Sequence, residues 1–214
     1  MWEKLKETTL DVLLPKKCVG CGREERYICE KCSLFLSEAP SIFRPGNLEE
    51  LVSIWEYEGL IKDIILKIKY DGIFEAIDEL VEMAFKAREP YVPEDTTITF
   101  VPMFKKKERE RGFNQAELIA QKVGELLSLA KQPVEVLSLL EKIKDTPSQT
   151  ELNKEERIKN VRDSFQRAEG VSCYNNVLLV DDIWTSGATM KECAKVLKRS
   201  GVEKIWGFTL ARAV

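Results

Sequence analysis

Residues 177–189 read Val177-Leu178-Leu179-Val180-Asp181-Asp182-Ile183-Trp184-Thr185-Ser186-Gly187-Ala188-Thr189, and this stretch decides the fold. Its first four residues are apolar without interruption, which is typical of a strand buried in a parallel sheet. Two carboxylates follow directly, then a turn rich in hydroxyls with one glycine, and we expect a helix to begin at about Met190. Because ligands of open α/β sheets bind outside the carboxyl ends of the strands, the stretch predicts a binding site there.

The turn is suited to holding a phosphate group. It offers backbone N–H groups and three hydroxyls, and the helix that follows adds the positive end of its dipole. The acidic pair would repel phosphate unless the ligand also carries a divalent metal or sugar hydroxyls, which donate hydrogen bonds to carboxylates. A ribose 5-phosphate that bears a Mg²⁺-bound pyrophosphate meets these conditions.

The same stretch resembles the phosphoribosyl-pyrophosphate (PRPP) signature of type I phosphoribosyltransferases. In that signature the acidic pair, here Asp181 and Asp182, holds the ribose, and the hydroxyl-rich loop holds the 5-phosphate. The loop residues are Thr185, Ser186, Gly187, Ala188 and Thr189. Two alternatives are a surface turn after a core strand and the metal-binding Walker B strand of a P-loop ATPase. The second alternative needs the motif G-x-x-x-x-G-K-[ST], which this sequence lacks.

The composition bounds the class of protein. A chain of 214 residues can hold one sizeable domain and a small appendage, and we expect domains at 1–45 and 46–214. No apolar run approaches the ~18 residues needed to span a bilayer, and the N-terminus lacks the pattern of a signal peptide. We therefore expect a cytoplasmic protein with no membrane insertion. A net charge of −3 excludes a globally basic face for nucleic acid, and the absence of histidine leaves proton transfer and metal binding to other side chains.

Four cysteines near the N-terminus form two C-x-x-C pairs separated by seven residues: Cys18, Cys21, Cys29 and Cys32. Four thiolates suit a tetrahedral Zn²⁺ ion with Zn–S distances near ~2.3 Å, and four protein ligands leave no open position, so we expect a structural zinc site. Disulfides, a thioredoxin-like redox pair and an iron–sulfur cluster are the weaker alternatives. Cys173 and Cys193 lie outside this pattern, and we interpret them as packing residues.

The rest of the chain alternates between helical and strand patterns. The expected elements are helices at 1–14, 60–70, 74–88 and 114–129, and strands at 53–57, 97–101 and 134–137. This alternation predicts an α/β fold, with a mostly parallel sheet covered by helices on both faces.

Two polar segments are candidates for the remainder of the site. The first, residues 102–115, follows the strand at 97–101 at the same sheet edge as the acidic pair, and we expect a loop whose cations meet a pyrophosphate. Gly112 would let the backbone approach the ligand closely. The second segment, Lys142 to Phe165, is too long to be a simple linker within a compact domain, so we expect a lid.

The chain resembles the ComF (ComFC) family of amidophosphoribosyltransferase-like competence proteins along essentially its whole length. The resemblance rests on the four cysteines, the Ile68-Lys69-Tyr70-x-Gly72 turn, Val101-Pro102 with the Arg111–Gln115 run, Thr146-x-x-Gln149, Arg157-x-x-Asn160-Val161 with Phe165, and the Asp181–Thr189 signature. The family usually has two threonines where this chain has Thr185-Ser186, and an arginine where Lys142 stands.

The resemblance implies a type I phosphoribosyltransferase fold with an N-terminal zinc-binding module. It also implies a role in natural transformation, with single-stranded DNA and a competence helicase as partners. The expected catalytic residues are Asp181, Asp182 and Arg111, and the expected PRPP-binding residues outside the signature loop are Lys69, Lys105, Arg109, Gly112 and Asn114. The expected lid residues are Lys142, Thr146, Gln149, Arg157 and Asn160.

Two functions of different class follow. In the first, the protein transfers ribose 5-phosphate from PRPP to an acceptor, with Mg²⁺ and the basic loop stabilising the departing pyrophosphate. In the second, it is a non-catalytic competence factor that senses PRPP or a nucleotide, or that binds single-stranded DNA. The densest basic patch, at residues 105–111, would carry such DNA binding, with Phe104 and Phe113 as the only stacking candidates that the sequence indicates.

Overall fold

A computed structural model describes residues 16–40, 44–130, 134–146, 159–171 and 174–213. Its centre is a four-stranded sheet in the order β1-β6-β5-β2, and every neighbouring pair is parallel. The strands are β1 (Glu50–Glu56), β2 (Thr96–Phe100), β5 (Asn176–Trp184) and β6 (Lys204–Arg212). The predicted α/β fold with a parallel sheet is therefore confirmed.

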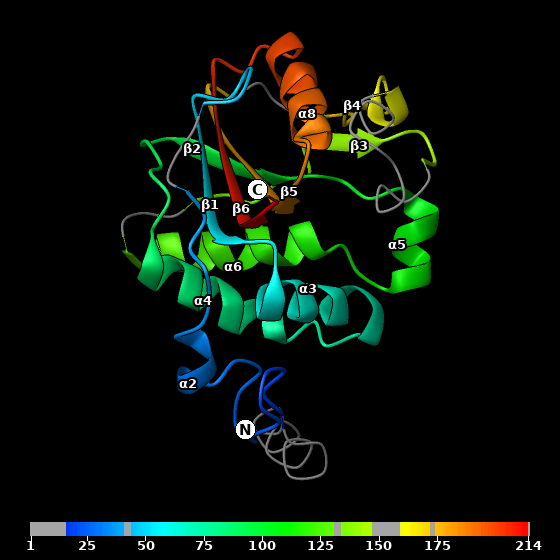
Figure 1. The fold of residues 1–214 in the computed structure, drawn as a ribbon. Helices are drawn as coiled ribbons and strands as arrows, with labels where there is room; N and C mark the ends of the chain where they lie inside the picture. The colour runs from blue at the N-terminus through cyan, green and yellow to red at the C-terminus, as the bar shows by residue number, and fades with distance from the viewer. Residues whose placement is uncertain (1–15, 41–43, 131–133, 147–158, 172–173, 214) are drawn as a thin grey trace, which may run out of the picture.

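Helices cover both faces of this sheet. Figure 1 shows α3, α4 and α6 on one side and α8 on the other. Their bounds are α3 (Gly59–Asp71), α4 (Ala76–Ala87), α6 (Gln115–Ala130) and α8 (Ala188–Arg199). The apolar sides of these helices and the nearly fully buried strands form one continuous hydrophobic core. Because burial of a parallel sheet on both faces removes most polar side chains from its interior, the acidic residues that remain in β5 stand out.

The last strand was not predicted, although it completes the sheet. β6 lies between β1 and β5, so the first and the last strand of the chain are neighbours in the sheet. A buried hydrogen bond of 2.7 Å joins the hydroxyls of Ser53 in β1 and Thr209 in β6, which are also partners in the strand register. Each hydroxyl therefore satisfies the other within the core.

The basic segment after β2 differs from the expected loop. It forms a short helix, α5 (Lys105–Arg111), which ends at Gly112 in the left-handed conformation at φ +89°. Lysine, arginine and glutamate are good helix formers, and charged pairs such as Lys106–Glu110 support the turn. The helix directs successive cations to different sides, so they cannot all face one ligand.

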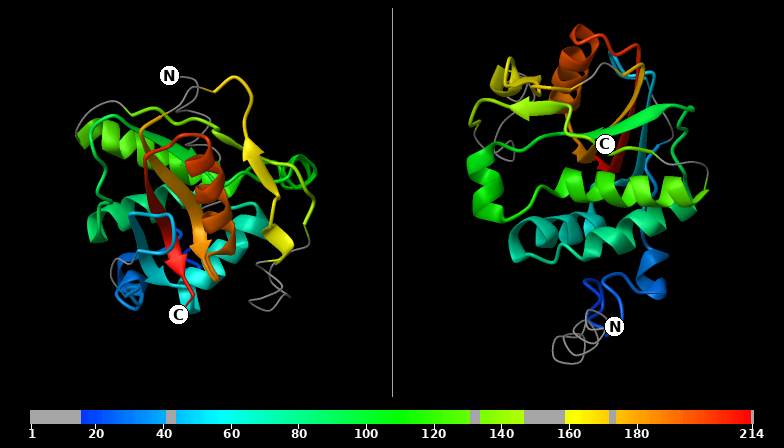
Figure 2. Two further views of the ribbon diagram at one scale, coloured as in Figure 1. Left: turned by 90° about the horizontal axis from the view of Figure 1, so that it is seen from above. Right: turned by 180° about the vertical axis from the view of Figure 1, so that it is seen from behind.

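Two further segments complete the architecture. β3 (Leu140–Lys142) and β4 (Phe165–Arg167) form a separate antiparallel pair beside α8, so the two ends of the expected lid are joined (Figure 2). The strand expected at 134–137 is present only as an isolated bridge between Ile98 and Val136. The ladder ends there because the hydroxyl of Thr99 accepts the Leu139 N–H and donates to the Leu137 carbonyl.

The cysteine-rich segment lies against the α3–α4 side of the domain, with a one-turn helix, α2 (Glu30–Ser33). Its attachment is specific, because the Glu79 carboxylate of α4 accepts the backbone N–H groups of Tyr27 at 3.0 Å and Ile28 at 2.9 Å. The helix expected at 1–14 lies outside the described residues. Across the described ranges, no helix combines the length and the apolar character needed to cross a membrane.

Candidate functional site

A cavity of about 750 Å³ opens at the carboxyl edge of the sheet. Its walls come from the ends of β2 and β5, the last turn of α3, the α5–α6 region and the start of α8. Parallel strands bring these ends together, so segments more than a hundred residues apart in sequence share one site.

The acidic pair lies on the floor of this cavity, and a lysine neutralises part of it. Asp181 and Asp182 are both largely buried, and an Asp181 carboxylate oxygen accepts the Asp182 backbone N–H at 2.9 Å. Lys69, in the last turn of α3, forms a close ion pair with the Asp182 carboxylate. The site therefore holds two carboxylates and one ammonium group in an environment with little water.

Burial and charge act differently on these groups. Burial raises the pKa of Asp181 well above its ordinary value, and the negative charge of Asp182 raises it further. Burial alone would lower the pKa of Lys69, but the attraction of Asp182 outweighs burial, so the pKa of Lys69 is raised. The charge of Asp182 thus keeps Lys69 protonated, while the Asp182 backbone N–H and the charge of Lys69 offset the cost of burying Asp181 only in part. A group with several donors, such as a sugar, or a cation would relieve that cost.

The turn after the acidic pair can only be built with glycine at its centre. Gly187 has a φ of +72°, and a Cβ atom added there would lie 2.1 Å from the Trp184 ring. The Ser186 hydroxyl accepts the Ala188 backbone N–H at 3.3 Å, which stabilises the start of α8. The helix begins at Ala188, two residues before the expected Met190, and its first residues, which carry the positive end of the helix dipole, line the cavity.

Three further cations line the cavity: Lys107, Arg111 and Lys142. Arg111 donates to the side-chain oxygen of Gln115 at 2.7 Å. Lys107 donates to the Thr146 carbonyl and lies 3.5 Å from the Asp145 carboxylate. Burial lowers the pKa of Lys142, and the positive charge of Lys107 lowers it further. Both lysines would therefore gain from an anion between them.

The structure brings many of the predicted site residues together around this cavity. Those that line it are Lys69, Arg111, Asn114, Lys142, Thr146, Asp181, Asp182, Thr185, Gly187, Ala188 and Thr189. The predicted residues that do not line it are Lys105, Arg109, Gly112, Ser186 and Asn160. Gln149 and Arg157 lie outside the described residues, as does Cys173.

Two of these placements have a clear physical cause. Lys105 is exposed on α5 and lies 3.7 Å from Glu141, so its charge is directed away from the cavity. Asn114 lines the cavity, but its amide donates to the Val101 carbonyl at 3.1 Å and accepts the Ala116 N–H at 3.1 Å. These bonds give Asn114 a role in starting α6, which is a frequent use of asparagine at helix starts.

Several lining residues were not among the predicted ones: Tyr57, Tyr70, Lys107, Glu110, Phe113 and Trp184. Lys107 is part of the predicted basic segment, but it differs from its neighbours only in the side of α5 on which it lies. Tyr70 follows the predicted Lys69 directly, but nothing in the sequence assigns its ring a role. Tyr57 follows the end of β1, which is the position where a parallel sheet places ligand contacts.

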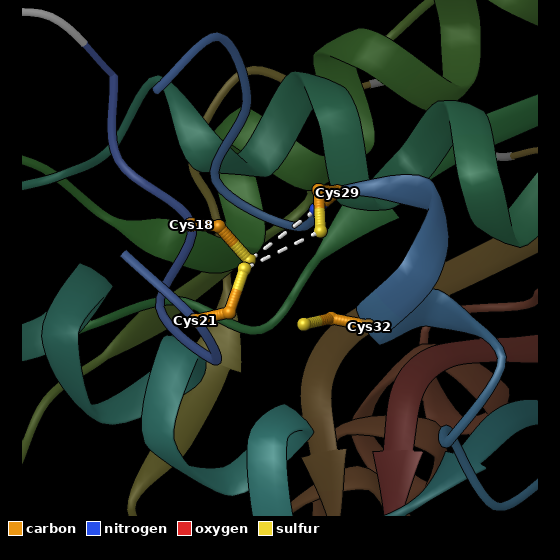
Figure 3. A group of neighbouring side chains, drawn as sticks. All are labelled: Cys18, Cys21, Cys29 and Cys32. Atoms are coloured by element: carbon orange, nitrogen blue, oxygen red, sulfur yellow. Dashed lines mark hydrogen bonds between the residues drawn. The ribbon is translucent and has the colours of Figure 1, made fainter. Parts of the chain in front are cut away.

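The four N-terminal cysteines converge at a second site (Figure 3). Their sulfur atoms all lie within 4.8 Å of one another, and the Cys21 and Cys29 sulfurs are 3.6 Å apart. Four sulfurs at ~2.3 Å from a tetrahedral ion would be separated by about 3.8 Å, so the cluster fits a metal ion such as zinc. No disulfide joins the cysteines of the described ranges, and Cys193 is buried in α8, well away from this cluster in sequence and structure.

The thiol groups of this cluster have opposed pKa shifts. Burial alone would raise the pKa of Cys18. Hydrogen bonds from backbone N–H groups, that of Cys29 foremost, outweigh burial and lower this pKa to about 6. Burial and the neighbouring thiols raise the pKa of Cys32 to about 12. Crowded thiols resist ionising together because their charges repel, and a divalent cation removes that repulsion.

Comparison with known proteins identifies relatives that span most of the chain. The chain is 28% identical over 203 residues to competence protein F of Haemophilus influenzae, which covers 92% of this chain and 84% of that protein. It is 27% identical over 207 residues to competence protein ComFC of Streptococcus pneumoniae, covering 96% and 85%. It is also 24% identical over 207 residues to the DNA utilization protein YhgH of Escherichia coli, covering 92% and 89%. No family model matches the chain. These relatives confirm the resemblance to the ComF family and support membership of it.

The two carboxylates should respond in opposite ways to amidation. Because the pKa of Asp181 is raised, the folded state binds its proton more tightly than the unfolded chain, so Asp181 lowers stability as the pH rises above about 4. We expect Asp181→Asn to raise the free energy of unfolding at pH 7, with little effect at pH 4. Asp182→Asn should lower it by up to about 3–5 kcal/mol, because the buried Lys69 ammonium loses its partner.

Urea denaturation at pH 4, 5.5 and 7 measures both effects. The double variant Lys69→Gln/Asp182→Asn is the control, and it should recover part of the loss caused by Asp182→Asn alone. Equal destabilisation by the two single substitutions at pH 7 would contradict the assignment of the ion pair to Asp182.

Proposed function

We propose that this ComF-like chain binds PRPP in the cavity and transfers its ribose 5-phosphate to an acceptor. The observation that carries the proposal is the juxtaposition, in one cavity, of a buried acidic pair and a glycine-dependent turn at the N-terminus of α8. A ligand that satisfies both must carry an anionic group and several hydroxyl donors on a short frame. Ribose 5-phosphate has that arrangement.

The 5-phosphate would lie at the turn 185–189. Backbone N–H groups at the start of α8 and the hydroxyls of Thr185 and Thr189 supply the donors, and the helix dipole favours the negative charge. The ribose hydroxyls would donate to the Asp181 and Asp182 carboxylates, which replaces the water that burial removed.

The pyrophosphate would lie between Lys107, Arg111 and Lys142. Mg²⁺ bound to the pyrophosphate would supply further neutralisation of its charge. The carbon–oxygen bond to pyrophosphate breaks with its electron pair on the leaving oxygen. The acceptor then forms a bond to the same carbon and loses its proton to solvent or a base. The carboxylates favour the positive charge that develops on the sugar, because they are already in place.

The names of the relatives bear on the biological role. Two are competence proteins and one is a DNA utilization protein. We infer a role in DNA uptake in natural transformation, with single-stranded DNA and a competence helicase as the proposed partners, inside the cell. None of these names refers to a transferase, which favours a second candidate: a non-catalytic factor that uses the same cavity to sense PRPP or a nucleotide.

The proposed lid is the segment between β3 and β4. Lys142 and Thr146 line the cavity from its first part, and the antiparallel pairing of Lys142 with Phe165 fixes both ends. Closure over bound PRPP would exclude the water that competes with the acceptor.

We further propose that the cysteine cluster holds a structural zinc ion. Four sulfur ligands close the coordination shell, and Glu79 ties the loop to α4, so the ion would fix the segment against the domain. We also propose residues 1–45 as a module distinct from residues 46–214, with the ion at its centre.

Ligand binding should raise the thermal stability of the protein. PRPP with Mg²⁺ binds only the folded state, so the melting temperature should rise with ligand concentration. Thr189→Ala should reduce this rise, and Thr189→Ser, which keeps the hydroxyl, should restore it. Pyrophosphate release across bases, nucleosides and single-stranded DNA then separates the two candidates, because only the transferase releases it. A larger shift with ATP and none with PRPP would contradict the proposal.

The affinity for PRPP should fall at alkaline pH through Lys142. Its pKa is lowered, so it loses its proton, and its attraction for the ligand, at a pH below the ordinary lysine range. Phosphate ionisation is complete above about pH 8, so the fall between pH 8 and 10 reports on the protein. Lys142→Arg should remove the fall, because arginine stays charged. Lys86→Arg, an exposed position on α4, is the control and should leave it unchanged. If Lys142→Arg and the wild type showed the same pH dependence of PRPP affinity, this role of Lys142 would be contradicted.

Metal analysis should find about one zinc ion per chain. Cys29→Ser should lower the zinc content, because three sulfur ligands hold zinc less tightly than four. Cys193→Ser is the matched control, since Cys193 is buried outside the cluster. A metal-free preparation with a Cys18–Cys32 disulfide, identified by peptide mass spectrometry, would overturn the zinc proposal.

A further inference from the structure

The mouth of the cavity carries exposed aromatic rings that neither the core nor the phosphate chemistry requires. Tyr70 is 65% exposed and lines the cavity, and Phe74 is 50% exposed. Phe74 lies against Phe113, another lining residue, with ring centroids 5.7 Å apart and planes tilted by 54°. Large apolar rings left in water are unfavourable, so their gathering at a cavity mouth points to a ligand that covers them.

A cation is built into the same surface. The Arg111 guanidinium carbon lies 5.7 Å from the Tyr70 ring centroid, and the guanidinium donates a hydrogen bond to the Gln115 side chain. We call this surface, composed of Tyr70, Phe74, Arg111 and Phe113, the aromatic rim. A flat cation and three rings are the groups on which planar heteroaromatic molecules stack.

The chain takes sharp turns to form the rim. α3 ends at Gly72 with a φ of +74°, which turns the chain between Tyr70 and Phe74. α5 ends in the same way at Gly112, directly before Phe113. The two breaks lie at the ends of different helices and bring their aromatic residues to one place. The rim is therefore a product of the tertiary structure.

The position of the rim relative to the acidic pair identifies the ligand. Lys69 contacts Asp182 on the floor of the cavity, and the next residue, Tyr70, presents its ring at the mouth. A ligand that contacts both places carries hydroxyl groups at one end and a planar ring at the other. A sugar attached to a nucleobase joins these two groups, whereas an inorganic anion or ribose 5-phosphate alone would leave the rim uncovered.

We propose that the aromatic rim binds a nucleobase, stacked on Tyr70 and Arg111, next to the ribose 5-phosphate position. This inference rests on the proposed function and adds the chemical class of its second ligand. A free nucleotide and a single strand of nucleic acid share this chemistry. The rim keeps Phe113 from the stacking candidates that the sequence indicated, and it adds Tyr70 and Phe74 at the end of α3.

Binding measurements with four probes test the rim. The probes are ribose 5-phosphate, adenosine, adenosine 5′-monophosphate and a short oligothymidylate, each titrated by calorimetry into the full chain. Tyr70→Ala should weaken binding of the base-bearing probes by about five- to a hundredfold and leave ribose 5-phosphate unchanged. Tyr70→Phe should retain wild-type affinity. Tyr91→Ala is the matched control, because Tyr91 is 63% exposed and packs on Trp206 instead of the cavity.

The outcomes separate this inference from the proposed function. Loss of affinity for the mononucleotide in Tyr70→Ala supports a free nucleotide as the source of the base, and loss for the oligothymidylate alone supports a strand. The proposal that the rim binds a nucleobase is overturned if the base-bearing probes bind the wild type and Tyr70→Ala equally, or if they do not bind at all. Failure of ribose 5-phosphate to bind, with Tyr70-dependent binding of adenosine, would reject the PRPP site and leave the rim standing.

Discussion

The parallel direction of four strands places their carboxyl ends on one edge, and the two carboxylates of β5 are buried there. This arrangement needs a cation, because two buried charges of one sign repel and neither is solvated. Lys69 provides it from the last turn of α3, so the ion pair with Asp182 ties the end of that helix to β5. The adjacent Tyr70, the left-handed Gly72 and the rim beyond them depend on the same placement.

The site contains charged groups whose burial lowers the stability of the folded protein. Asp181 remains buried with a raised pKa, and Lys142 is half-buried near another cation, Lys107, with a lowered pKa. Replacing such groups by apolar residues of similar size frequently stabilises a protein. Their presence around one cavity is therefore better explained by a ligand that brings complementary charge and hydrogen bonds than by stability.

The sequence predicted the parts of the fold whose pattern is local. The apolar run before Asp181 indicated β5, the turn 185–189 indicated the start of α8, and the cysteine spacing indicated the cluster at the N-terminus. The helix at Lys105–Arg111 was missed because it has no apolar face, and hydrophobic periodicity is the main signal for a helix. The pairing of β6 between β1 and β5 depends on contacts between distant segments, which one sequence does not reveal. For the same reason the sequence could not distinguish Lys107, which lines the cavity, from Lys105, which does not.

The contact between Gly187 and Trp184 has an optical consequence. The indole ring is 5% exposed, lies directly beneath the turn, and has the Lys191 ammonium 5.5 Å from its centroid. Trp55 and Trp206 are buried elsewhere in the sheet and do not line the cavity. The emission of Trp184 is thus sensitive to any shift of the turn or of that nearby charge. The protein carries its own fluorophore under the candidate phosphate position, so occupancy of the turn can be followed in the unlabelled chain at equilibrium and in real time.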